Sequence, residues 1–185
     1  MDHQQPISGW RGNTVALSEV TLRRGVGRFV RPTLFCYTNS MKYLSKSLEE
    51  TGQIAKTFLE TIYPIGGSSV VVALEGNLGA GKTAFTQEVG KILGVVENIH
   101  SPTFVIEKIY SIDWKGFKNL IHIDAYRLEK DSELLHLGWE EITREPENLV
   151  FLEWPENVAG IIPASAKRIY FKFIDENTRE INYEN

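Results

Sequence analysis

The feature that most constrains this chain is an eight-residue stretch, residues 76–83, with the sequence GNLGAGKT. It fits the pattern G-x-x-x-x-G-K-[ST] of a P-loop, in which glycines let the backbone curl so that successive N–H groups face a phosphate. Lys82 would bring a positive charge to the phosphate oxygens, and the Thr83 hydroxyl would bind Mg²⁺. Such a match arises by chance in about 1% of chains of this length, so the stretch predicts a site for ATP or GTP. The residues predicted here to contact the nucleotide are Gly76, Asn77, Leu78, Gly79, Ala80, Gly81, Lys82, Thr83 and Ala84.

The segments on either side of this loop support the same interpretation. Residues 70–74 (VVVAL) form a continuous apolar run that is mostly β-branched, which is typical of a buried parallel strand. Residues 84–93 carry apolar side chains at helical spacing, and Gly94 follows as a helix stop. A strand, a glycine-rich loop and a helix in this order predict an α/β fold.

The rest of the chain adds strands that run in both directions. Residues 104–110 and 119–124 are joined by a short polar connection, which predicts an antiparallel hairpin. Residues 166–174 alternate between polar and apolar side chains, and residues 179–183 could pair with them as an edge strand. Further predicted elements are a helix opened by a capping box at residues 47–50 and ending near Tyr63, a short helix at 131–137 and a buried strand at 149–152. Together these predict a P-loop NTPase-like, three-layer α/β sandwich with a mixed parallel and antiparallel sheet.

Composition narrows the class of protein further. The 185 residues are 42% hydrophobic, enough for the core of one domain, and the net charge of −4 gives no bulk field for holding nucleic acid. No apolar run approaches the roughly 18 residues of a membrane span. A single cysteine, Cys36, excludes an intramolecular disulfide. A reducing, cytoplasmic setting without membrane contact is expected.

Residues 1–40 differ in composition from residues 41–185. They hold five of the nine arginines and none of the lysines, and they carry a charge of +3 against −7 for the remainder. Three interpretations are open: an organelle transit peptide, a basic tail for RNA or a protein partner, and an extension from a misassigned start with Met41 as the initiator. The abrupt change from arginine to lysine usage favours the third. Under all three, this segment is expected to be weakly ordered, ahead of an ATPase domain at 41–185.

Two carboxylates follow apolar strands and are candidates for the chemistry. Asp124 ends the run 120–123, and Glu153 ends the run 149–152. Ligands gather at the carboxyl ends of strands in open α/β sheets, so both acids could converge on the loop and take metal or catalytic roles. The alternative is that each is a solvated strand-end acid or a helix cap.

Four more side chains are candidates of lower specificity. Thr103, in a short Ser-Pro-Thr loop, could sense the γ-phosphate or simply begin a strand. Trp154 could pack near the nucleotide or fill the core. A lone histidine in a strand, such as His122, is more often a packed residue than a ligand. Arg127 could pair with a carboxylate, contact phosphate or lie on the surface.

Four motifs in this order and spacing, GNLGAGKT at 76–83, SPTF at 101–104, HIDAYRL at 122–128 and LEWPE at 152–156, resemble the signature of the TsaE (YjeE) family. The resemblance covers roughly residue 41 to the C-terminus, and residues 1–40 have no counterpart in the family pattern. It implies a bacterial P-loop ATPase with a mixed sheet that uses ATP and Mg²⁺. It also implies a role in synthesising threonylcarbamoyladenosine (t6A) in tRNA, with the TsaB–TsaD complex as protein partner and tRNA reached only through that complex.

The same resemblance implies roles for individual residues. Lys82 and Thr83 would hold phosphate and Mg²⁺, Asp124 and Glu153 would be the metal-side and catalytic carboxylates, and Thr103 would belong to the nucleotide-sensing loop. Metal-ligand candidates are thus Thr83, Asp124 and Glu153, and catalytic candidates are Glu153, Asp124 and Lys82. No motif locates the adenine, for which the first helix and the loop after Tyr63 are candidates.

Turnover without a partner is expected to be slow, because no arginine finger is evident. Two other functions remain open. A P-loop small-molecule kinase would close an arginine-bearing lid over the donor phosphates, and arginines are scarce beyond the loop. A nucleotide-gated binding module would bind ATP while its hydrolysis stayed incidental.

Overall fold

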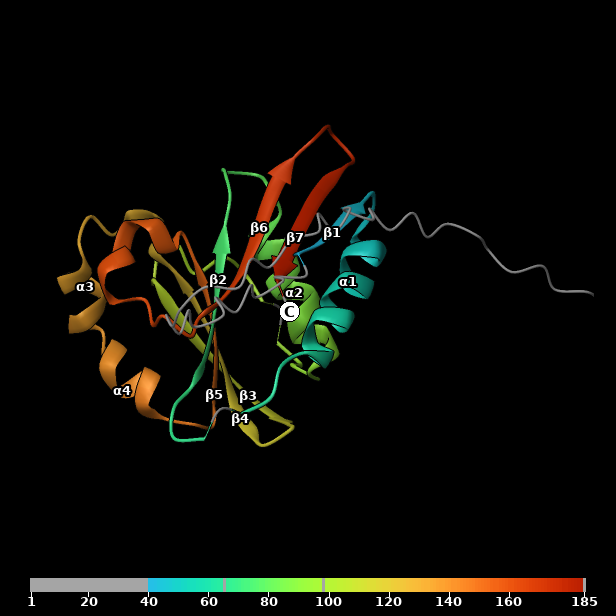
Figure 1. The fold of residues 1–185 in the computed structure, drawn as a ribbon. Helices are drawn as coiled ribbons and strands as arrows, with labels where there is room; N and C mark the ends of the chain where they lie inside the picture. The colour runs from blue at the N-terminus through green and yellow to red at the C-terminus, as the bar shows by residue number, and fades with distance from the viewer. Residues whose placement is uncertain (1–39, 65, 98, 185) are drawn as a thin grey trace, which may run out of the picture. The chain divides into compact units, whose positions relative to one another are not determined.

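A mixed sheet of seven strands organises the residues that the computed structural model describes, which are 40–64, 66–97 and 99–184 (Figure 1). The spatial order is β1-β7-β6-β2-β5-β4-β3. The strands are β1 (Ser40–Ser45), β2 (Val70–Glu75), β3 (Glu107–Trp114), β4 (Phe117–Asp124), β5 (Asn148–Glu153), β6 (Lys167–Phe173) and β7 (Arg179–Glu184). The four central strands β6, β2, β5 and β4 are parallel to their neighbours within this group, and the outer pairs are antiparallel. The predicted properties of residues 1–39 lie outside the described residues.

Helices cover both faces of this sheet, which confirms the predicted three-layer α/β sandwich (Figure 1). One face packs against α1 (Leu48–Glu60) and α2 (Lys82–Ile92). The other packs against α3 (Asp131–His136), α4 (Trp139–Arg144) and the 3₁₀ segment η2 (Pro155–Ile161), while a second 3₁₀ turn, η1 (Ala125–Arg127), follows β4. In the described ranges, no helix has the length and apolar character needed to cross a membrane.

Local sequence signals explain where the helices begin and end. The Ser47 hydroxyl accepts the Glu50 N–H at 3.1 Å, as the capping box predicts. The Glu50 carboxylate reaches back one residue further than expected and accepts the Lys46 N–H at 2.6 Å. Helix α1 ends at Glu60, three residues before Tyr63, and α3 is followed by Gly138 in a left-handed conformation with φ of 84°.

The predicted hairpin forms, but its first strand begins later than the sequence suggests. Residues 104–106 are apolar and were predicted to be extended, whereas β3 starts at Glu107. The Pro102 carbonyl instead accepts the N–H groups of Val105 and Ile106, which closes a turn. This turn leaves Phe104 and Val105 exposed.

The C-terminal strand was wrongly predicted to be an edge. Strand β7 lies between β6 and β1 and pairs with both in antiparallel register. The edge strand next to β7 is β1, which begins at Ser40 and which sequence analysis did not predict to be a strand. Helix α4 was also not predicted.

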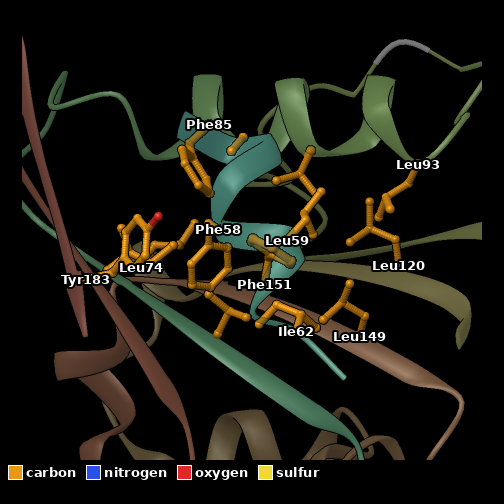
Figure 2. Packing of buried hydrophobic residues seen from close by; sticks show 14 of the residues in the cluster. Phe58, Leu59, Ile62, Leu74, Phe85, Leu93, Leu120, Leu149, Phe151 and Tyr183 are labelled. Carbon is orange, nitrogen blue, oxygen red and sulfur yellow. The ribbon is translucent and has the colours of Figure 1, made fainter. Parts of the chain in front are cut away.

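The larger core lies between the sheet and the helices α1 and α2, and its side chains interlock at aromatic contacts (Figure 2). Phe58 of α1 meets Phe85 of α2 edge to face, with ring centroids 6.0 Å apart. It meets Tyr183 of β7 at 5.0 Å in the same geometry. Phe58 therefore joins both helices to the C-terminal strand.

Phe58→Ala should be strongly destabilising, because Phe58 is fully buried and its ring contacts aromatic rings of α2 and β7. The expected loss in free energy of unfolding is about 3–5 kcal/mol, measured by urea denaturation. Val96→Ala is the matched control, since Val96 is 98% exposed and should change stability by no more than about 0.5 kcal/mol. Equal losses in the two variants would contradict this account of the core.

Candidate nucleotide-binding site

The candidate site is a cavity of about 530 Å³ at the carboxyl ends of the parallel strands. Residues 76–81 connect β2 to α2 there, and the parallel register places Leu74 opposite Glu153 and Glu153 opposite Asp124. Most of the predicted site residues line this cavity, namely Leu78, Gly79, Ala80, Gly81, Lys82, Thr83, Ala84, Thr103, Asp124, Glu153 and Trp154. Gly76 and Asn77 are not in its wall, but their carbonyls bind Lys82.

The loop needs glycine most strictly at Gly76. Its φ of 144° lies in a region that side chains disfavour, and a Cβ there would be 2.4 Å from the Phe171 carbonyl oxygen of β6. Gly79 and Gly81 also have positive φ, of 75° and 106°. Helix α2 starts directly after Gly81, so its free N–H groups and the positive end of its dipole face the cavity.

Lys82 lies inside the loop and is almost fully buried. Its ammonium donates to the carbonyls of Gly76 at 2.6 Å and Asn77 at 3.2 Å, and it lies 3.8 Å from the ring centroid of Trp154. Burial lowers the pKa of Lys82, while the nearby carboxylates of Glu153, Glu156 and Asp124 act in the opposite direction. A partly desolvated ammonium with acids around it is suited to attract phosphate oxygens.

Glu153 is held by two side chains from different elements. Thr83 donates from its hydroxyl to the two carboxylate oxygens, at 2.8 and 3.0 Å. The His122 Nε2 lies 2.8 Å from Oε1 of the same carboxylate. His122 is fully buried and its Nδ1 has no hydrogen-bond partner among the described residues. A neutral ring that donates from Nε2 fits both observations.

Asp124 has a separate set of donors. Its Oδ2 accepts hydrogen bonds from Ser101, at 2.8 Å, and from Thr103. Its Oδ1 accepts the Tyr126 N–H at 3.0 Å and so caps η1. The loop that carries Ser101 and Thr103 is thereby attached to the end of β4. In the described ranges, no cluster of three or more His, Cys, Asp or Glu side chains is arranged to hold a metal by itself.

Several residues of the site were missed or placed differently by sequence analysis. Residues 45–48 and 51 line the cavity and Tyr63 does not. The position of the adenine at the first helix or at the loop after Tyr63 stays a prediction. The Arg127 guanidinium lies 4.4 Å from the Phe104 ring and is not in the cavity wall. His122 was interpreted mainly as a packed residue. Its position two residues before Asp124, on the same face of β4, is the signal that would have found it.

Arg179 was also missed. It lies 98 residues beyond Gly81, outside every recognised motif, yet its Nε donates to the Gly79 carbonyl at 3.2 Å. Only the folding of β7 into the sheet brings it to the loop.

Comparisons with known proteins agree with this geometry. The family model described as "Threonylcarbamoyl adenosine biosynthesis protein TsaE" matches residues 45–181. The chain is 36% identical to a TsaE of Rickettsia typhi over 72% of this chain and 87% of the relative. It is 35% identical to a TsaE of Bacillus subtilis over 77% and 84%, respectively. A crystal structure of Bacillus subtilis YdiB superposes with a TM-score of 0.62 at 29% identity, covering 80% of this chain and 86% of that one.

Gly76→Ala tests the close approach of the loop to β6. The added methyl group would meet a backbone carbonyl that no side-chain rotation can move, at a cost of about 1–3 kcal/mol in addition to the backbone strain. Gly79→Ala is the control, because its surroundings are open and only strain of about 1–2 kcal/mol is expected. Urea denaturation of both variants gives the comparison. The interpretation fails if Gly79→Ala is the more destabilising of the two.

Proposed function

The chain belongs to the TsaE family of threonylcarbamoyl adenosine biosynthesis proteins, and we propose that it binds ATP with Mg²⁺ and hydrolyses it in the t6A pathway. The observation that carries this proposal is the shared cavity. A glycine-rich loop with a buried lysine faces two buried carboxylates, Asp124 and Glu153, in one space of about 530 Å³. That combination suits a nucleoside triphosphate and its metal.

The contacts favour particular residues for Mg²⁺. Thr83 and Glu153 offer hydroxyl and carboxylate oxygens that already lie within hydrogen-bond distance of each other. Oxygen donors of this kind are what Mg²⁺ binds, together with waters and phosphate oxygens. When bound, Mg²⁺ neutralises charge on the phosphates. The P-loop threonine and an acid at the end of the adjacent strand would therefore hold it, with His122 keeping the Glu153 carboxylate in place.

Asp124 then takes the second role. Its carboxylate is held by Ser101, Thr103 and the Tyr126 N–H, so its hydrogen-bond donors differ from those of Glu153. From the end of β4, it would orient the attacking water and receive its proton. This division reverses the one implied by the sequence resemblance, in which Asp124 was the metal-side acid and Glu153 the catalytic one.

The remaining cavity walls suggest how the nucleotide lies. The loop and the start of α2 would take the phosphates, and Lys82 would exchange its loop carbonyls for phosphate oxygens. The base would extend toward the β1–α1 junction at residues 45–51, which lines the same cavity. Ser101 and Thr103, which are tied to Asp124, would respond to the presence of the γ-phosphate.

Turnover is proposed to depend on the TsaB–TsaD complex. Among the described arginines, only Arg179 lines the cavity, and its donors are directed at backbone carbonyls. A site without an arginine directed at the transferred phosphate hydrolyses slowly, and a partner can supply the missing charge or close the site. tRNA would be reached only through that complex.

Adding TsaB and TsaD from the same organism should increase ATP hydrolysis at least severalfold over the chain alone. Phosphate release is measured at saturating Mg²⁺ and ATP, and calorimetry with ATP alone measures binding. A kinase would instead leave a phosphorylated metabolite and little free phosphate. No ATP uptake at millimolar concentration would overturn the proposed function, and unchanged turnover with the partners would remove the partner dependence.

Asp124→Asn and Glu153→Gln separate the two carboxylate roles. Asp124→Asn should retain Mg²⁺-dependent ATP binding while hydrolysis falls about 10²- to 10⁴-fold, because the amide cannot take the proton from water. Glu153→Gln should raise the Mg²⁺ concentration for half-maximal activity by about 10- to 100-fold. Steady-state kinetics with Mg²⁺ titration tests both. The opposite pattern would restore the assignment implied by the resemblance.

Full support of t6A formation by the hydrolysis-deficient Asp124→Asn protein would favour the nucleotide-gated binding module. A reconstituted tRNA modification assay with TsaB, TsaD and the synthase of the pathway gives that measurement.

A further inference from the structure

Arg179, at the first position of β7, lies beside the phosphate-binding loop and lines the cavity. Its Nε donates to the Gly79 carbonyl at 3.2 Å. One terminal nitrogen donates to backbone carbonyls of the β6–β7 turn, with the shortest contact at 2.7 Å to Asp175. The guanidinium lies 4.5 Å from the ring centroid of Phe173. One side chain therefore joins the C-terminal hairpin to the loop.

These contacts fix one peptide group of the loop from both ends. The peptide between Gly79 and Ala80 presents its carbonyl to Arg179, and its N–H donates to the Asn77 carbonyl at 3.1 Å. Gly79 has a φ of 75° and open space where a Cβ would lie. A glycine without neighbours at this point does little to prevent the peptide plane from rotating. Arg179 supplies the restraint that glycine lacks.

The guanidinium of Arg179 forms no ion pair with the residues that the structure describes. Within the described part of the chain, no carboxylate oxygen lies within 4.0 Å of its guanidinium, and its hydrogen-bond acceptors are all backbone carbonyls. Two roles are compatible with this environment. The positive charge could attract phosphate, or the planar guanidinium group could orient the loop through its hydrogen bonds. The hydrogen bonds favour orientation of the loop, because the Nε donates to the loop while a terminal nitrogen of the same planar group donates to the β6–β7 turn.

We propose that Arg179 is a positioning residue that holds the phosphate-binding loop in its binding conformation before nucleotide arrives. This inference rests on the proposed nucleotide site and extends it to a residue outside the sequence motifs. A loop that is ordered in advance loses less conformational entropy on binding, so its affinity rises for every ligand that occupies it. Arg179 then contributes equally to ATP and ADP binding and little to the chemical step.

The test compares Arg179→Met and Arg179→Lys with the unchanged protein. Calorimetry gives the dissociation constants for Mg²⁺–ATP and Mg²⁺–ADP, and steady-state kinetics separates kcat from KM. Both variants should bind ATP and ADP about 10- to 100-fold more weakly, as expected for loss of a hydrogen bond from a charged donor. The value of kcat at saturation should stay within about threefold. Lysine should fail like methionine, because its single ammonium cannot bridge the Gly79 carbonyl and the turn.

Hydrogen exchange in the free proteins supplies a readout that does not depend on nucleotide. Amides of residues 77–83 should exchange faster in both variants, while those of β5 should not change. Arg144→Met is the matched control, since Arg144 is exposed and its ion pair among the described residues is with Glu140 on α4. It should leave affinity, kcat and loop exchange unchanged.

Each other outcome overturns the proposal. If Arg179→Lys kept normal nucleotide affinity and Arg179→Met weakened ATP binding more than ADP binding, Arg179 would be a charge that attracts phosphate. A fall in kcat with unchanged affinity would make it a catalytic arginine. Unchanged nucleotide affinity and unchanged amide exchange of the loop would mean that Arg179 stabilises only the β6–β7 turn. Failure of the unchanged protein to bind ATP would refute the proposed function instead, so the two failures are distinguishable.

Discussion

The site depends on how one buried carboxylate is satisfied. Glu153 is 2% exposed, and a carboxylate out of water is costly unless donors surround it. Its donors come from the start of α2 through Thr83 and from β4 through His122. These elements reach Glu153 only because β2, β5 and β4 run parallel in register, which brings their carboxyl ends to one edge. The polar contacts thus require the correct strand order and, once formed, join the loop, the helix and the sheet.

Asp124 shows that the neighbouring acid belongs to a different network. It is as buried as Glu153, but its donors are the hydroxyls of the loop between α2 and β3 and the N–H of η1. One acid is therefore coupled to α2, and the other to a loop in which Phe104 and Val105 are exposed. A change at Asp124 would therefore act first on this loop, whereas a change at Glu153 would act first on α2 and β4. Separate hydrogen-bond networks allow two chemically similar groups to differ in role.

Much of this could be predicted from local sequence, for reasons that are also local. The glycines of residues 76–83, the apolar run before them and the helical spacing after them each specify short-range geometry, so strand, loop and helix were correct. The long-range features were not. The pairing of β1 with β7 spans nearly the whole described chain. Residues 104–106 have a strand-like composition, yet the Pro102 carbonyl draws them into a turn. The partner of β1 lies at the other end of the described chain, and the turn at 102–106 is a local alternative to a strand, so residue pattern alone decides neither feature.

The loop itself shows why a motif does not suffice to make a site. Glycines give it the freedom to wrap a phosphate, and the same freedom lets it collapse or turn over when nothing restrains it. The restraints come from elsewhere: the Phe171 backbone presses against Gly76, and Arg179 holds the Gly79 carbonyl. Both belong to the β6–β7 hairpin, which carries none of the recognised motifs. On the proposed function, the eight residues would select the ligand, and the hairpin nearly a hundred residues later would hold the loop in the shape that binds it.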